Sequence, residues 1–101
     1  MKSAAVKVVR IYLLEGPRPK EVMRYLREDA KVRRATLFRG VSGFGRSGTH
    51  EASLLDLSLQ LPVVIEFMVR PERLGPILEH LEALVPPGHL FTWDATVNDE
   101  P

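Results

Sequence analysis

The sequence predicts an α+β fold in which four strands and two helices follow one another in the order βαββαβ. Three observations support this order. Four apolar stretches have the alternation or the β-branched composition of strands, two stretches repeat apolar residues every three or four positions, and glycine or proline separates them. Right-handed crossovers then place both helices on one face of a four-stranded antiparallel sheet, which is the ferredoxin-like architecture.

The first strand is expected over residues 6–14, because apolar side chains recur on both of its faces. One face carries Arg10 among apolar neighbours, and the other is apolar apart from Lys7. The segment Gly16-Pro17-Arg18-Pro19 should end this strand, since proline cannot donate a hydrogen bond to a strand ladder.

The first helix is expected over residues 20–29, with Pro19 suited to its first turn. Residues 31–34 are expected to form a basic connector or a frayed last turn of the helix, where cations suit the negative end of the helix dipole. A short second strand over residues 35–39 follows. Apolar residues at three- and four-residue spacing give the helix one buried face, and these are Val22, Met23, Leu26 and Ala30.

Four of the seven glycines fall within residues 40–48, between two strand-like stretches. Glycine costs backbone entropy on folding, so such a cluster suits a loop that approaches a ligand closely or changes shape. Arg46, His50 and Glu51 add charge and acid–base chemistry to this loop. A mobile surface hairpin with incidental charges is the alternative interpretation. Residues 51–61 are ambiguous, although their alternating leucines favour a strand.

A second helix is expected over residues 72–85, with its regular part beginning near Pro76. The sequence Pro86-Pro87-Gly88 should end this helix, because proline cannot continue it. Residues 90–97 predict the last strand, and the acidic tail at 98–101 is expected to fray.

The strand over residues 62–69 is the clearest in the chain and, like the strand over 6–14, is largely apolar on both faces. Two helices can cover only one side of the sheet. Each large apolar side chain left in water costs about 1.5–3 kcal/mol. We therefore expect the second face to meet other copies of this chain in a homo-oligomer.

The composition is that of an ordinary soluble globular chain, with 45% apolar and 27% charged residues. A length of 101 residues predicts a single domain over 1–101. The absence of cysteine excludes disulfides and thiolate metal sites. No apolar run approaches the roughly 20 residues of a spanning helix, and the first residues do not form a secretion signal. We expect a cytoplasmic protein without membrane insertion.

Charge is unevenly distributed along the chain. Residues 1–40 hold eleven Lys or Arg against four Asp or Glu, a net charge of +7, whereas residues 41–101 hold three against nine, a net charge of −6. A basic half can attract phosphates or nucleic acid. Basic and aromatic residues do not interleave as a nucleic-acid surface requires, so contact within or between subunits is the favoured explanation.

Catalytic chemistry is poorly represented, and we expect no enzyme. Of the three histidines, His80 and His89 have the sequence context of exposed positions, and only His50 lies in a plausible site. A lone His–Glu pair in a loop lacks the fixed partner that acid–base catalysis needs. A metal site built from His50, Glu51 and Asp56, or a small enzyme using His50 and Glu51, is the second hypothesis.

Anion binding is better supported by the glycine loop. Successive backbone amides in such a loop can form a concave nest for phosphate, and the guanidinium of Arg46 can pair with two phosphate oxygens. No Gly-Lys-Ser/Thr follows, so the loop is not a Walker A sequence. A strand rather than a helix comes next, so it is not a dinucleotide fingerprint.

The same residues resemble the nitrogen-regulatory PII-like family, and most closely its uncharacterised branch known as domain of unknown function 190. Gly43-Phe44-Gly45-Arg46 followed by Gly48-Thr49-His50-Glu51 is similar to the base of the PII loop, with His and Thr exchanged and a spacer one residue shorter. Leu61-Pro62 and Ile65-Glu66 are similar to the PII segment entering the third strand. Thr36 lies one residue out of register with the PII threonine before the loop.

The resemblance implies a ferredoxin-like homotrimer that binds adenine nucleotides in clefts between subunits. The nucleotide would act as an effector, with no cofactor, and the loop would dock on a target protein such as a transporter or an enzyme. Gly45 and Arg46 would meet phosphate, while Thr36 and Glu66 would lie near the base. The ligand-binding residues expected on this basis are Thr36, Gly43, Phe44, Gly45, Arg46, Ser47, His50 and Glu66.

Two departures from the PII pattern narrow the range of ligands that we expect. The segment after the second helix is Pro86-Pro87-Gly88-His89, without the family's lysine-bearing loop, and the C-terminus is acidic rather than arginine-bearing. Charge-assisted contacts contribute about 1.5–3 kcal/mol each, so a monophosphate, a cyclic nucleotide or another small anion suits the site better than ATP. The loop has no tyrosine for uridylylation. A structural oligomer whose loop only packs against its neighbour is the third hypothesis.

Overall fold

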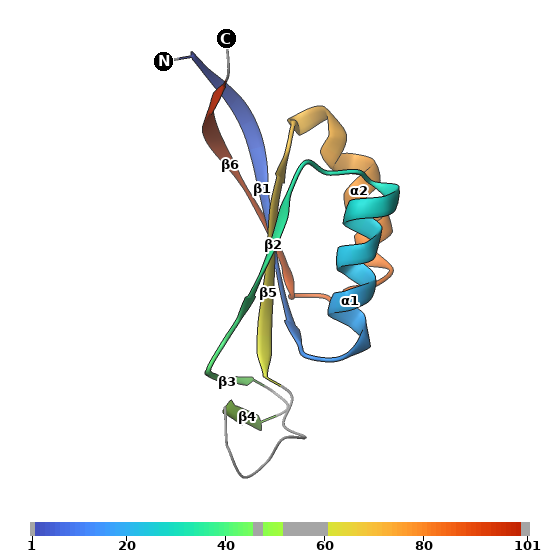
Figure 1. Ribbon diagram of the computed structural model, residues 1–101, viewed down its shortest axis with the longest axis vertical. Helices are drawn as coiled ribbons and strands as arrows, with labels where there is room; N and C mark the ends of the chain where they lie inside the picture. Colours follow the sequence, from blue (N-terminus) through green and yellow to red (C-terminus); the bar gives the residue numbers. More distant parts are fainter. Residues whose placement is uncertain (1, 46–47, 52–60, 100–101) are drawn as a thin grey trace.

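The computed structural model describes residues 2–45, 48–51 and 61–99. Four strands form one antiparallel sheet in the order β2-β5-β1-β6, and two helices cover one of its faces (Figure 1). This confirms the predicted α+β fold. The sheet strands are β1 (Lys2–Leu14), β2 (Ala35–Arg39), β5 (Pro62–Val69) and β6 (Leu90–Asp99), and the helices are α1 (Pro17–Arg24) and α2 (Leu74–Glu82).

The core lies between the sheet and the helices. Odd-numbered residues of β1 and β5 point into it, and Ile11 pairs directly with Ile65 across the two central strands. Val22, Leu26 and Leu81 close the core from the helical side and are fully buried. Alternation in the strands and the helical repeat in α1 and α2 thus meet in one apolar layer.

The opposite face of the sheet is left open by the helices. The strand register places the even-numbered residues of β1, β2 and β5 on this face, together with the odd-numbered residues of β6. We call it the open face. Its large exposed apolar side chains are Tyr12, Phe38, Met68, Phe91 and Trp93.

Several element boundaries differ from the sequence prediction. Helix α1 begins at Pro17 rather than Lys20, because the fixed φ of proline suits the first turn of a helix, where no intrahelical N–H bond is needed. It continues without a break into a π-helical turn over Tyr25–Asp29. Helix α2 ends at Glu82, before the predicted Val85, and a 3₁₀ turn over Pro71–Arg73 precedes it.

The two ends of the described chain pair with each other, which corrects the predicted fraying for Asn98 and Asp99, whereas residues 100–101 lie outside the described residues. Strand β1 already begins at Lys2, whose partner in β6 is Asp99. Arg70 also donates a hydrogen bond of 3.3 Å to the Asp99 carboxylate. The ladder and this ion pair extend the last strand two residues beyond the predicted Val97.

The glycine-rich segment forms a small hairpin at the far end of the molecule from the two termini (Figure 1). Strand β3 (Ser42–Gly45) pairs with β4 (Gly48–Glu51) in an antiparallel register. The strand considered for residues 51–61 falls largely on residues 52–60, which lie outside the described residues. Among the described helices, none is long and apolar enough to cross a membrane.

Candidate functional site

The predicted ligand residues divide into two groups, of which the first lies on the open face. Thr36 on β2 and Glu66 on β5 are direct cross-strand partners. Glu66 is not a free carboxylate, because one of its oxygens accepts hydrogen bonds from Nε of Arg10 at 3.1 Å and from Nη2 at 2.5 Å. A ligand approaching Glu66 would therefore meet an ion pair with no net charge.

The second group lies in the hairpin. Gly43 pairs with His50, and Gly45 pairs with Gly48, so backbone atoms of the predicted binding segment lie side by side. Phe44 is 89% exposed, so nearly all of its ring is open to solvent. The predicted contacts of Arg46 and Ser47 lie outside the described residues, as does any contact of the His50 side chain.

Glycine is needed where the hairpin meets the sheet. A Cβ on Gly40 would lie 2.8 Å from Cγ of Pro62, and one on Gly43 would lie 3.3 Å from the same atom. The N–H of Gly40 also donates to the carbonyl of Pro62 at 2.7 Å. The closer approach gives Gly40 a structural role, whereas a Cβ on Gly43 would require only a small shift of Pro62.

The two groups are separated along β5. The hairpin contacts Pro62 at the start of the strand, and Glu66 follows four residues later, which corresponds to about 13 Å at the rise of a β-strand. Within one chain, the described parts of the predicted set therefore do not form a single compact cluster.

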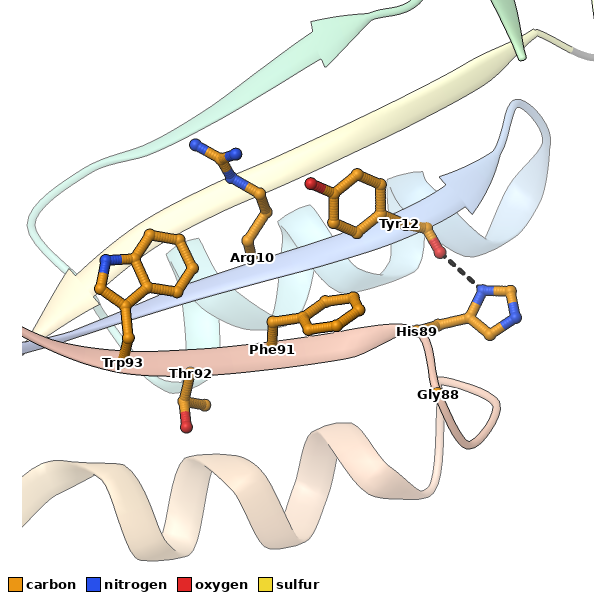
Figure 2. Close-up of a pocket in the computed structure, with 7 residues that line it drawn as sticks. All are labelled: Arg10, Tyr12, Gly88, His89, Phe91, Thr92 and Trp93. Atoms are coloured by element: carbon orange, nitrogen blue, oxygen red, sulfur yellow. Dashed lines mark hydrogen bonds between the residues drawn. The ribbon is translucent and has the colours of Figure 1, made fainter. Parts of the chain in front are cut away.

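A hollow on the open face contains residues that were not in the predicted set. It has a volume of about 500 Å³ and lies between β1 and the first half of β6 (Figure 2). Arg10 and Tyr12 project from β1 on the same side as Phe91 and Trp93 from β6, whereas Thr92 points the opposite way. His89 closes one end, where its Nδ1 donates a hydrogen bond of 2.8 Å to the carbonyl of Tyr12.

The hollow combines aromatic walls with one cation. The Tyr12 and Phe91 rings meet edge to face, with centroids 5.5 Å apart, and the guanidinium of Arg10 lies 5.4 Å from the centre of the Trp93 ring. The hydrogen bond with Glu66, followed by one with Tyr12, raises the pKa of Arg10. Arg10 thus stays charged, and the hollow is suited to a flat aromatic group or to apolar side chains from another subunit.

No motif in the sequence indicated this hollow, but the positions of two charged residues within apolar strands did. Arg10 has the same parity as the apolar residues of its strand, and Glu66 is the one charged residue of the 62–69 strand. Two isolated opposite charges on central strands indicate a cross-strand pair, but their register was needed to place them together.

The described histidines offer no catalytic or metal-binding cluster. Among the side chains that the structure describes, no three or more of His, Cys, Asp or Glu gather in a way that could hold a metal ion. His80 and His89 are exposed, as expected, and the ring of His80 stacks on Tyr25 with centroids 3.8 Å apart. The hypothetical site of His50, Glu51 and Asp56 rests on side chains outside the described part.

Solved structures with the same architecture define the class of protein. CPII from Thiomonas intermedia K12, in a structure bound to ADP and bicarbonate, superimposes with a TM-score of 0.75 at 28% identity, covering 97% of this chain and 93% of CPII. CPII is described as a nitrogen regulatory PII-like protein. CutA1 from Oryza sativa has the same fold, with a TM-score of 0.64 at 10% identity over 98% of this chain and 85% of CutA1. The chain is a PII-like protein.

Sequence comparison identifies the family within this class. The family model of DUF190 (Uncharacterized ACR, COG1993) matches residues 6–97, and the chain belongs to this family. The UPF0166 protein MJ1524 of Methanocaldococcus jannaschii is 31% identical over 85 residues, which cover 78% of each chain. The resemblance seen in the glycine-rich segment and the element order is therefore confirmed.

Proposed function

We propose that this protein is a small PII-like regulator that binds an anionic ligand, an adenine nucleotide among the candidates, between subunits. It would act without catalysis, as a single cytoplasmic domain over residues 1–101. The observation that carries the proposal is the likeness to CPII, a PII-like protein of similar length whose solved structure holds ADP and bicarbonate. The glycine-rich hairpin, whose sequence is similar to that of the PII loop base, supports it.

A site shared between copies of the chain fits the separation of the two predicted groups. Thr36 and Glu66 lie about 13 Å along β5 from the hairpin, so a second copy can bring its hairpin to the first copy's Glu66 where one chain does not. The exposed aromatic residues of the open face favour self-association, because leaving them in water is unfavourable. We propose a homotrimer closed by cyclic symmetry.

The ligand is expected to carry few phosphates. Arg46 is the one arginine of the predicted set, and the nearby Arg10 of the open face is already paired with Glu66. One guanidinium and a row of glycine amides suit one or two phosphate groups, or a small anion such as bicarbonate. We therefore expect AMP or ADP to bind more tightly than ATP.

The hairpin is also the proposed contact with a target protein, such as a transporter or an enzyme. Phe44 is almost fully exposed at its surface, and Val41 beside it is 77% exposed. Aromatic and aliphatic side chains held out on a loop are typical anchors of protein interfaces.

Isothermal titration calorimetry with AMP, ADP, ATP, cyclic AMP and bicarbonate tests the proposal. We expect at least one nucleotide to bind, with a loss of roughly tenfold in Arg46→Ala, the equivalent of one charge-assisted contact. Lys2→Ala is the control, because Lys2 lies at the opposite end of the molecule (Figure 1). No heat with any of these ligands would reject the ligand-binding function. Hydrogen exchange adds a second criterion, since amides of residues 43–45 that are slow without ligand would favour a purely structural loop.

A further inference from the structure

A basic groove lies on the side of the molecule away from the open face. It is a hollow of about 470 Å³ between α1 and the connector that leads into β2. Five cations line it: Lys20, Arg24, Arg27, Arg33 and Arg34. Half-buried Met23 and Val32 form its floor, and its lining contains no acidic side chain.

The nearest carboxylates neutralise only part of this charge. Arg24 lies 3.5 Å from Glu28 and 3.6 Å from Asp29, and Arg27 lies 3.8 Å from Glu28. These are long, exposed ion pairs, which contribute little to stability, so a carboxylate of a bound partner can readily replace them. Lys20, Arg33 and Arg34 have no ion-pair partner in the part of the chain that the structure describes.

We propose that this groove binds an acidic, extended segment of a partner protein. Lys20, Arg24 and Arg27 follow one another at four- and three-residue spacing, so they form a row of about 10 Å along one side of α1 and of the π-helical turn that continues it. Alternate side chains of an extended peptide recur about every 6.6 Å, close to the rise of one helical turn. Two or three carboxylates of such a segment can therefore face this row, while Arg33 and Arg34 approach from the connector.

The composition of the groove favours a protein segment over nucleic acid. No aromatic side chain lines it, so it offers no surface on which bases could stack. Met23 and Val32 instead provide apolar contact for the aliphatic parts of a peptide. A row of separate cations is also too long to be satisfied by one compact phosphate group.

This inference does not rest on nucleotide binding. The groove lies at the start of β2, whereas the hairpin follows the end of the same strand, at the other end of the sheet (Figure 1). A partner held in the groove would be bound through a surface distinct from the hairpin.

Fluorescence anisotropy with a labelled ten-residue peptide of alternating Glu and Ala tests the groove. We expect binding that weakens with added salt, and a loss of roughly tenfold in Arg33→Gln/Arg34→Gln. The matched control is Lys2→Gln/Arg18→Gln, which removes the same charge from exposed positions outside the groove and should leave binding unchanged. Circular dichroism and the nucleotide titration should be the same for both double variants and the parent chain.

Three results would overturn the inference. The first is equal affinity for a peptide of alternating Gln and Ala, which would mean that the carboxylates do not contribute to binding. The second is an equal loss of binding in the control variant, which would indicate nonspecific attraction. The third is tighter, Arg33- and Arg34-dependent binding of a ten-nucleotide single-stranded DNA or of tripolyphosphate, which would reassign the groove to nucleic acid or to a compact anion.

Discussion

Arg10 and Glu66 face each other across the two central strands and form an ion pair in the middle of the open face. The guanidinium donates from Nε and Nη2 to one carboxylate oxygen, at 3.1 and 2.5 Å. Apolar and aromatic side chains surround the pair on β1, β5 and β6. A charged pair within an apolar surface can fix the register in which two such surfaces associate.

Removing one member of this pair should harm assembly more than removing both. In Glu66→Leu, Arg10 keeps its charge but loses its acceptor, so we expect a lower melting temperature and a smaller assembled fraction on dilution. In the double variant Arg10→Met/Glu66→Leu, both quantities should recover toward those of the parent chain. Light scattering coupled to size exclusion and a thermal melt measure the two effects. If the single and double variants behave alike, the pair has no role in association.

Strand β6 offers a second test of the open face, because adjacent residues point to opposite sides. Trp93 is 42% exposed on the open face, and Thr92 points away from it (Figure 2). Trp93→Glu would place a second carboxylate beside the Arg10–Glu66 pair, so one negative charge would stay uncompensated in the proposed interface, at a cost of about 4 kcal/mol, or roughly a thousandfold weaker association. We expect single chains in sedimentation of Trp93→Glu and an unchanged mass for Thr92→Glu. An unchanged mass for both would place the interface elsewhere.

Two glycines should respond in opposite directions to the same substitution. In Gly40→Ala, the new Cβ would lie 2.8 Å from Pro62 Cγ and 3.3 Å from the Pro62 carbonyl oxygen, so we expect a loss of about 1–3 kcal/mol in the free energy of unfolding. Gly75 lies in α2, and a methyl group added there would meet no atom within 4 Å outside its two chain neighbours and the adjacent backbone of its own helix, so Gly75→Ala should gain about 0.5–1 kcal/mol. Urea unfolding measures both. Equal stabilities would mean that the chain relaxes around Gly40.

The order of helices and strands in the sheet domain could be predicted from the sequence, because the patterns that mark these elements were clear. Strand β5 was predicted with its observed bounds, since β-branched residues fill both faces and Pro62 marks its start. Prolines at 17 and 19 were ambiguous, because the residue that ends a strand can equally begin a helix. The pairing of Lys2 with Asp99 was missed, since pairing between residues at opposite ends of a chain leaves no local signal.

The candidate site was less accessible to sequence reasoning. Thr36 and Glu66 were both named, and the β2–β5 register brings them together. The engagement of Glu66 by Arg10, however, depends on the register of strands 56 residues apart. Only the cluster of charges in residues 31–34 indicated the basic groove in the sequence. Its other wall comes from α1, and the side of α1 that faces the groove depends on how the helix packs against the core.

The closing of the chain at Gly40 and Pro62 has a further consequence. The N–H of Gly40 donates to the carbonyl of Pro62 at 2.7 Å, and the N–H of Glu15 donates to the carbonyl of Leu61 at 2.8 Å. Both ends of the segment from 41 to 61 are therefore held at the same edge of the sheet by backbone hydrogen bonds. Lengthening a loop whose ends are already held together adds little entropic cost. Substitutions or insertions between residues 41 and 61 should therefore leave the four-stranded sheet and its two helices intact.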